Sequence, residues 1–495
     1  MLFGRADDDN ATLVGQRLHY DERDDHAPAS GAAVTIDQHH WQQRLDELSR
    51  QHGVPGASLA VWAQGGLTEA ATGVLNVETQ VDATTDSVFQ IGSITKTYTA
   101  TLVMQLVEEG RIDLDEPVVR VLPDLRLGDE EATEQVTMRH LLTHTSGIQG
   151  DFFDDFGRGD DVLSRFVEGC ADLGFSHPVG ATMSYCNTGY VLAGRVIELL
   201  TGRTWDQALH ERLLAPAGLR HTVTLPEEAL RFRAAHGHVA EPGEQPHLAP
   251  VWGLPRCLGP AGLVCATASD MVAFGRMHLD GGRSADGVAV LPERQAAAMT
   301  TEQVRLPDPW TLGAAWGLGW TLYDWDGRRL HGHDGNTLGQ SAFLRVVPDS
   351  DVVVGLVANG GRTRELYRAL FAELMAQLCD LRMPPALEPP PEPPAVDAAP
   401  LAGHYERVAR SVDLTTDGAT LTGQIALTGP LAELDENPVQ EVRLVPVTDR
   451  VFVTRDDEND MWTPVVFYEL EDGSRYLHMG GRATPRVETG LPASA

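Results

Sequence analysis

The chain has 495 residues, and 71 acidic against 38 basic residues give it a formal net charge of −33. This charge excludes nucleic acid and anionic membranes as expected partners, because both are bound through basic surfaces. A hydrophobic fraction of 42% suffices for a large buried core, yet no apolar run approaches the roughly 18 residues of a membrane span.

Two further features concern the cellular compartment. The first residues lack the basic and apolar stretches of a secretory signal. The five cysteines are odd in number and form no C-x-x-C pair, which predicts reduced thiols rather than a disulfide framework. We therefore expect a cytoplasmic protein.

The predicted elements begin after a polar, acid-rich stretch, residues 1–35, which we expect to be a flexible tail. An amphipathic pattern predicts a helix from residue 36 to about 53, and two apolar runs between residues 57 and 76 predict a hairpin. Beyond residue 93, apolar side chains recur at helical spacing: Ala100, Val103, Met104 and Val107. That spacing predicts a helix of about four turns with one buried face.

Later segments complete the first predicted domain, residues 36–383. Helices are predicted at 162–170 and 189–202, among loops rich in glycine and proline. Two long apolar strands, 340–348 and 351–359, meet at a tight turn, and an amphipathic helix follows them. A helix before the first hairpin and another after the last strands predict an antiparallel sheet covered by helices, an α+β fold.

The last part of the chain differs in texture. Residues 384–400 are rich in proline and predict an extended linker. From residue 401 onward, short alternating runs are separated by turn signals such as Asp417-Gly418 and Asp472-Gly473. Residues 401–495 are therefore predicted to form a small all-β domain, a barrel or a sandwich.

Lys96 is the sole lysine of the chain, so every other basic residue counted above is an arginine. Arginine stays protonated, and a task that needs a neutral amine must fall to Lys96. Ser93 precedes it by three residues, which on a helix puts both side chains on one face, about 5–6 Å apart at Cβ. A serine at a helix start, beside an amine kept neutral by burial, can act as a nucleophile. The alternative is a capping serine followed by a lysine that reaches solvent.

Tyr185 and Asn187 form a Y-x-N triplet. A phenol beside an ammonium group has a lowered pKa and can relay protons as a general acid or base, which we expect of Tyr185. The amide of Asn187 points to the same side if the stretch is extended. The alternative is a buried tyrosine bonded to the backbone and an asparagine in a turn.

His333, Asp334 and Gly335 stand just before the two long strands. The glycine would let a substrate backbone lie along a strand, and the histidine offers a tunable hydrogen-bond donor. The alternative is a strand histidine with a turn glycine. Three histidine pairs, 39–40, 236–238 and 331–333, have no further ligands at metal-site spacing, so we expect loop or surface histidines and neither a metal nor a cofactor.

The order of these motifs resembles that of the β-lactamase and penicillin-binding-protein superfamily. Four blocks carry the resemblance: VFQIGSITKTYTA, VTMRHLLTHTSGI, GPAGLVCATASDMVAFG and GHDGNTLGQSAFLRVVPDSDVVVGLVAN. The resemblance covers residues 36 to 383. Within the superfamily, this sequence is similar to the branch that contains class C-like enzymes, D-stereospecific aminopeptidases, esterases and transacylases. The last domain resembles the lipocalin-like appendage of some members.

The resemblance implies roles for the first two motifs. Ser93 would be the acylated nucleophile, and Lys96 its activating base. Tyr185 would relay a proton to the leaving group, and Asn187 would bind a substrate carbonyl or orient Lys96. We expect His144 and Cys186, which lie near these motifs, to be packing residues.

For the third motif, the resemblance implies that the backbone N–H groups of Ser93 and Asn336 form an oxyanion hole. Asp334 and Gly335 complete the strand motif. His333 stands where many members have the lysine of K-T-G, so the motif lacks a permanent cation to bind a substrate carboxylate. Ala261 stands where a glycine is common.

We predict a serine acyl-transfer enzyme that hydrolyses ester or amide bonds of small molecules or peptides through an acyl-Ser93 intermediate. The sequence leaves open a biosynthetic transacylase, or a thioesterase-type peptide cyclase, that passes the acyl group to an amine or alcohol. It also leaves open a homo-oligomer. A non-catalytic ligand-binding protein on the same scaffold is the alternative from another class.

Overall fold

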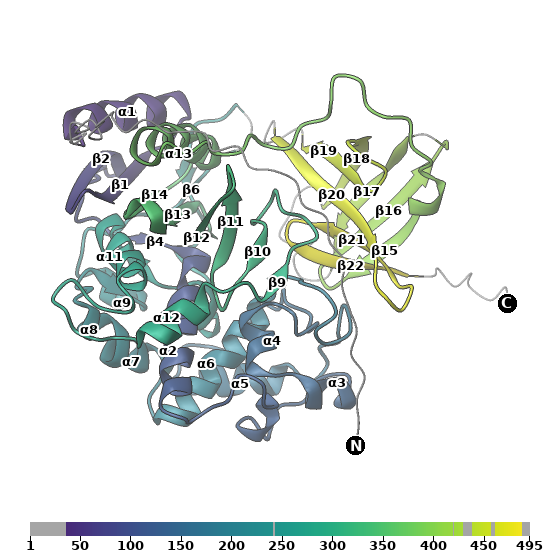
Figure 1. Ribbon diagram of the computed structural model, residues 1–495, viewed down its shortest axis with the longest axis horizontal. Coiled ribbons are helices and arrows are strands. Elements are labelled where there is room, and N and C mark those ends of the chain that lie inside the picture. Colours follow the sequence, from purple (N-terminus) through teal and green to yellow (C-terminus); the bar gives the residue numbers. More distant parts are fainter. Residues whose placement is uncertain (1–35, 241–242, 419, 429–437, 457–460, 488–495) are drawn as a thin grey trace, which may run out of the picture. The chain divides into compact units, whose positions relative to one another are not determined.

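The computed structural model describes residues 36–240, 243–418, 420–428, 438–456 and 461–487 (Figure 1). The predicted tail, residues 1–35, lies outside the described residues. In the described part of the chain, no helix has the length and apolar character needed to cross a membrane.

The central element is an antiparallel sheet, to which the described residues contribute nine strands in the order β3-β2-β1-β14-β13-β12-β11-β10-β9. Their bounds are β1 Gly56–Ala63, β2 Gly66–Asn76, β3 Val81–Asp82, β9 Val304–Arg305, β10 Ala315–Trp316, β11 Thr321–Trp325, β12 Arg328–Thr337, β13 Gln340–Val347 and β14 Val352–Ala358. The predicted hairpin is the β1–β2 pair, and the two predicted apolar strands are β13 and β14.

Helices cover both faces of this sheet (Figure 1). Helices α1 (Gln38–Gln51) and α13 (Thr363–Cys379) pack on one face, where Trp41 and Leu45 meet the apolar side chains of β1 and β14. Helix α11 (Ala268–Leu279) packs on the other face, against β1, β13 and β14. Because both faces are covered, all seven residues of β14 are buried, which explains its uninterrupted apolar sequence.

The remaining helices and short strands lie mostly between β3 and β9 in the chain. Their bounds are α2 Thr95–Glu108, α3 Glu130–Gln135, α4 Met138–Leu142, α5 Val162–Gly169, α6 Asn187–Thr201, α7 Trp205–Leu209, α8 Ala215–Ala217, α9 Pro226–Ala229, α10 Gly259–Gly262, α12 Glu293–Met299, β4 Phe89–Gln90, β5 Thr222–Val223, β6 His238–Val239, β7 His247–Leu248 and β8 Cys265–Ala266. Helices α5 and α6 match the predicted helices at 162–170 and 189–202, and the α+β fold is confirmed.

Helix α2 differs from its prediction. The expected single buried face is wrong, because every residue from Thr95 to Leu106 is buried. The helix packs against α6, α7, α10 and α12, so no side of this segment meets solvent. The threonines on its polar side bond internally: Thr99 donates to the Pro260 carbonyl at 2.7 Å, and Thr101 to the Thr97 carbonyl at 2.8 Å. These bonds remove the cost of burying the hydroxyl groups.

A closed barrel of eight antiparallel strands lies within the described part of the chain after residue 401. Its strands are β15 Gly403–Arg407, β16 Arg410–Thr416, β17 Leu421–Leu427, β18 Val439–Pro446, β19 Val451–Asp456, β20 Met461–Glu469, β21 Arg475–Met479 and β22 Arg482–Val487. Tyr405, Phe452 and Phe467 pack inside it. The prediction of a small all-β domain is confirmed, as a barrel rather than a sandwich.

Candidate active site

Ser93 and Lys96 lie at the start of α2. Ser93 sits in a single turn of 3-10 helix, Gly92–Ile94, that leads directly into α2. Lys96 Nζ lies 3.0 Å from Ser93 Oγ and donates a hydrogen bond to the Ala261 carbonyl at 2.6 Å. The predicted helical spacing therefore places the hydroxyl and the amine in hydrogen-bonding contact.

Lys96 is completely buried, which contradicts the alternative of a lysine that reaches solvent. Its Nζ lies 4.8 Å from the centroid of the Tyr185 ring and 5.6 Å from that of Tyr190. Burial holds the pKa of Lys96 well below its usual value, and the positive charge of Arg482 lowers it further. Both effects favour the neutral amine, which is the form that can accept a proton from Ser93.

Tyr185 forms another wall of the site. Burial raises the pKa of Tyr185, although a hydrogen bond with Ser93 and the charge of Arg482 oppose this. The lowered pKa expected from the sequence is therefore wrong. That expectation assumed an ammonium group next to the phenol, whereas burial favours the uncharged form of the Lys96 amine. The phenol remains protonated and is available as a proton donor.

The backbone around Ser93 approaches β12 very closely. A Cβ atom at Gly335 would overlap the Ile91 carbonyl and lie 2.9 Å from the Ser93 nitrogen. A Cβ atom at Gly92, whose φ is +51°, would lie 2.5 Å from the Asn336 nitrogen. Gly335 is thus needed by the serine turn itself, not only by a substrate lying along the strand. This approach brings together the backbones of Ser93 and Asn336, the pair predicted to bind an oxyanion.

His333 lies on β12 and is buried, with its ring centroid 6.4 Å from that of Tyr185. Its Nδ1 lies 2.5 Å from the Asp334 carbonyl. Burial lowers the pKa of His333 to about 3, so the imidazole is neutral. The surface or loop position expected for the histidine pairs is wrong for His331, His333 and His238, which are all buried.

Asp334 does not remain free for a substrate. Its carboxylate forms a 2.6 Å ion pair with Arg345 and a 3.4 Å pair with Arg364, at the start of α13. Arg345 is buried and also donates to the Tyr367 hydroxyl at 2.7 Å. Asp334 is therefore a structural anchor beneath the strand motif, and Arg364 is the partner that reaches toward solvent.

The predicted residues surround one cavity of about 370 Å³. Six of them line it: Ser93, Tyr185, Asn187, His333, Asp334 and Asn336. Lys96 and Gly335 do not line the cavity but contact the turn that carries Ser93. Apolar side chains, including Phe153, Leu254 and Leu312, line the rest of the cavity together with two arginines, Arg364 and Arg482.

The two arginines were not predicted, and they change the character of the site. Arg482 begins strand β22 of the barrel, almost 400 residues after Ser93, and its guanidinium carbon lies 5.1 Å from the Tyr185 ring centroid. The Tyr185 N–H donates to the Gly481 carbonyl at 2.9 Å. Two guanidinium groups from outside the H-x-G motif therefore line the cavity. No local motif marks these arginines in the sequence.

His144 also lies closer to the site than expected. Its ring is buried and stacks on Tyr185 with 4.2 Å between centroids. Its backbone has a φ of +59°, and its Nδ1 accepts a hydrogen bond from the Cys186 N–H at 3.0 Å. Cys186 in turn caps α6 through a 3.3 Å bond from the Gly189 N–H. Both residues pack as predicted, and together they shape the Y-x-N segment.

Among the described residues, no group of three or more His, Cys, Asp or Glu side chains is arranged to hold a metal ion. The five cysteines are all free and buried. Burial raises the pKa of the Cys186 thiol to about 11, so this cysteine is not a reactive thiolate.

Known proteins resemble this chain in sequence. Residues 41–377 match the Beta-lactamase family. The chain is 52% identical over 376 residues, 76% of its length and 99% of the relative's, to "Penicillin-binding protein 4" of Amycolatopsis lactamdurans.

Solved structures extend the likeness to the barrel. A crystal structure of SurE is 31% identical with a TM-score of 0.76, and the match covers 91% of this chain and 99% of that one. A D-amino acid amidase from Ochrobactrum anthropi SV3, solved with L-phenylalanine amide, is 25% identical with a TM-score of 0.59, over 69% of this chain and 99% of the other. By its sequence match and its fold, the chain belongs to the Beta-lactamase family.

Proposed function

We propose that this protein is a serine acyl-transfer enzyme that works through an acyl-Ser93 intermediate. The observation that carries the proposal is the 3.0 Å contact between Ser93 Oγ and the buried amine of Lys96, whose pKa is held well below its usual value. A neutral amine in contact with a hydroxyl is the arrangement that turns a serine into a nucleophile.

The first half-reaction follows from this contact. Lys96 Nζ takes the Ser93 proton while Oγ attacks the carbonyl carbon of the substrate. The resulting oxyanion is bound by the N–H groups of Ser93 and Asn336, whose backbones lie side by side. When the intermediate collapses, the bond to the leaving group breaks, and the protonated Tyr185 phenol donates its proton to that group. Lys96, whose Nζ lies 4.8 Å from the Tyr185 ring centroid, then passes the proton that it took from Ser93 to the phenolate.

In the second half-reaction, an acceptor attacks the acyl-Ser93 carbonyl. Tyr185 and Lys96 take the acceptor's proton and return one to Ser93 Oγ when the ester bond breaks. Water as the acceptor gives hydrolysis, and an amine gives a new amide bond. Hydrolysis of an ester or amide is the activity that we propose first.

The cavity supports a peptide-like substrate with an anionic group. Its apolar lining suits an aliphatic or aromatic side chain, and the guanidinium groups of Arg364 and Arg482 suit a carboxylate. The two carboxylates nearby, Asp334 and Asp151, are already paired with arginines and do not repel an anion.

The amine acceptor is a second candidate function, supported by one observation. A structure of SurE with D-Leu is 30% identical to this chain over 91% of its length. An amino acid carries both an amine, which can attack an acyl-enzyme, and a carboxylate, which a cavity arginine can bind. Under this candidate the enzyme joins an acyl group to an amino acid or to the amine end of the same peptide.

Mass spectrometry of the intact protein tests the proposal. A fluorophosphonate should add one adduct at Ser93, and the Ser93→Ala variant should add none. A screen of p-nitrophenyl esters, D- and L-amino-acid amides and peptidyl thioesters, with and without D-leucine, then separates hydrolysis from transfer by the products. A protein that forms no adduct and turns over no substrate is a ligand-binding protein on the same scaffold.

A further inference from the structure

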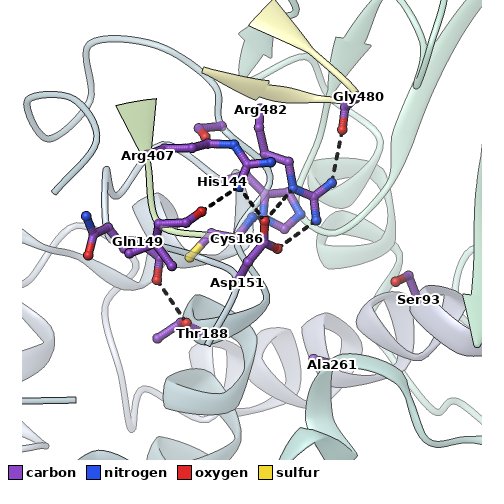
Figure 2. Close-up of polar contacts among 12 residues, drawn as sticks. Ser93, His144, Gln149, Asp151, Cys186, Thr188, Ala261, Arg407, Gly480 and Arg482 are labelled. Atoms are coloured by element: carbon purple, nitrogen blue, oxygen red, sulfur yellow. Dashed lines mark hydrogen bonds and ion pairs between the residues drawn. The ribbon is translucent and has the colours of Figure 1, made fainter. Parts of the chain in front are cut away.

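A buried carboxylate, that of Asp151, forms ion pairs with two arginines of the barrel. Arg482 binds it through two nitrogens, at 2.9 Å and 3.1 Å, and Arg407 of β15 binds it at 2.8 Å. Figure 2 shows Asp151 between these two arginines, which come from opposite ends of the barrel sequence. Only 11% of the Asp151 side chain is exposed.

The two arginines differ in what else they face. The Arg482 guanidinium lines the catalytic cavity and lies over the Tyr185 ring. Arg407 is not among the residues that line the cavity, and its other hydrogen bond goes to the Val408 carbonyl. Asp151 therefore joins a residue of the cavity wall to one outside it.

The backbone on both sides of Arg482 is also held by the Y-x-N segment. Tyr185 donates its N–H to the Gly481 carbonyl at 2.9 Å, and the Ala483 N–H donates to the Ser184 hydroxyl at 3.1 Å. These bonds place the Cα of Arg482. They leave its side chain, which has several rotatable bonds, to be oriented by Asp151 and by a 3.0 Å bond to the Gly480 carbonyl.

Asp151 is itself tied to the same segment. The preceding carbonyl, that of Gly150, accepts hydrogen bonds from the N–H groups of Asn187 and Thr188, at 3.1 Å and 3.3 Å. Although burial opposes ionisation, Arg482 and Arg407 lower the pKa of Asp151 to about 2, so the carboxylate is charged at any working pH. The Asp151 carboxylate is thus ionised and held in a fixed position beside the cavity.

We propose that Asp151 is a positioning residue that acts on the reaction through Arg482; this inference rests on the function proposed above. The Asp151 carboxylate holds the Arg482 guanidinium against the Tyr185 ring. In that position the guanidinium faces the substrate. Arg407 supports the contact between the two parts of the chain but does not serve the chemistry. When both oxygens of a carboxylate bind one guanidinium, the carboxylate fixes the plane of the guanidinium as well as the distance between the two groups.

A double-mutant cycle tests this role. The rate constant for acylation of Ser93 by an activated ester is measured for the wild type, Asp151→Asn, Arg482→Gln and the double variant. We expect each single variant to lose about 100-fold, because misplacing a substrate-facing group by about 1 Å has this effect. The double variant should be no slower than Arg482→Gln, since Asp151 has no arginine left to position in the cavity.

Arg407→Gln is the matched control, since it removes the other ion pair of the same carboxylate. We expect its rate constant to stay within about threefold of the wild type and its KM to be unchanged. Thermal unfolding of every variant identifies losses caused by misfolding. If Asp151→Asn does not fold, Asp151→Glu keeps the charge but displaces the carboxylate, and it should lower kcat while the fold is retained.

Three outcomes overturn the proposal. Losses that multiply in the double variant show that Asp151 acts independently of Arg482. An equal loss in Arg407→Gln shows that the carboxylate only docks the barrel. Full activity in folded Asp151→Asn or Asp151→Glu shows that it is not needed. A wild type that forms no Ser93 adduct overturns the proposed function and this inference together, whereas a labelled wild type with any of the three outcomes overturns the inference alone.

Discussion

The amine of Lys96 is the residue-scale feature on which the proposed chemistry depends. The amine is fully buried and contacts Ser93. It donates one N–H to the Ala261 carbonyl. In its neutral form, the nitrogen lone pair is left to accept the proton of Ser93. A primary amine can lose its charge in such a place, but a guanidinium cannot. The identity of this side chain matters more than its charge.

Lys96→Arg is therefore expected to be nearly as inactive as Lys96→Ala, with both variants losing about 10²–10⁴-fold in the acylation rate, the range for a lost general base. The measurement is the burst of p-nitrophenol from an activated ester. If the arginine variant kept most of the wild-type rate, the neutral-amine role would be refuted.

The pH dependence of the reaction belongs to the same residue. Lys96 must be neutral to accept a proton, so kcat/KM should fall as the pH drops through its pKa. Burial is the main cause of its lowered pKa, Arg482 adds to it, and Cys186 and Asp151 oppose it. Arg482→Gln removes a positive charge and raises the Lys96 pKa, so the acid limb of the profile should move to higher pH.

Arg475→Gln is the control for this shift, because Arg475 is a half-exposed barrel arginine paired with Glu469. Its profile should coincide with that of the wild type. An acid limb that stays in place in Arg482→Gln would contradict the assignment of this limb to Lys96.

At the scale of elements, the contact between α6 and α10 supports the site. Gly194 of α6 lies directly against Pro260 of α10, and the next residue, Ala261, carries the carbonyl that binds Lys96. A Cβ atom at Gly194 would overlap the Pro260 ring. The helix pair can therefore approach closely enough to hold Lys96 only if this position has no side chain.

Gly194→Ala is expected to lower the free energy of unfolding by about 1–3 kcal/mol, the usual effect of overpacking, and to slow acylation by displacing Ala261. Gly189→Ala in the same helix is the matched control. There a Cβ atom would make ordinary 3.5 Å contacts, so the change should be neutral or stabilising by up to about 1 kcal/mol. Denaturant unfolding measures both, and an equal effect in the two variants would contradict this account.

At the scale of the whole molecule, the barrel forms part of the wall of the candidate active site. It contributes the Arg482 side chain to the cavity and the Gly481 carbonyl to the Tyr185 N–H. A further bond joins the Tyr468 hydroxyl to Thr182 at 3.1 Å, a few residues before the Y-x-N triplet. The segment that holds Tyr185 is therefore built against the barrel.

Removal of residues 385–495 should abolish acylation by small esters as well as by large substrates, because the loss affects Tyr185 rather than access to the cavity. Burst kinetics with a short and a long acyl ester give the comparison, and circular dichroism shows whether the remaining part is folded. A folded, truncated protein that still reacts with the small ester would instead indicate a barrel that only selects substrate length.

Much of the fold, and the grouping of the candidate site residues, could be predicted because the signals are local. Helical spacing places Ser93 beside Lys96, and apolar runs mark β13 and β14. Predictions failed for properties that depend on tertiary packing rather than on a local sequence pattern. The threonines of α2 look like a solvent-facing side, yet their hydroxyls are paired internally and buried. The pKa of Tyr185 depends on how deeply three segments bury it, which no stretch of sequence states.

The sequence by itself determined which side chains could perform the chemistry: one amine, a serine a turn before it, a phenol and a histidine-x-glycine strand. These assignments rest on covalent order and helix geometry, which act over a few residues. Only the tertiary structure decided that Arg482 of the barrel lines the cavity and that Asp151 binds this arginine. These contacts join residues more than 300 positions apart. They form because the packing of whole elements, rather than local spacing, determines which charged groups are buried together.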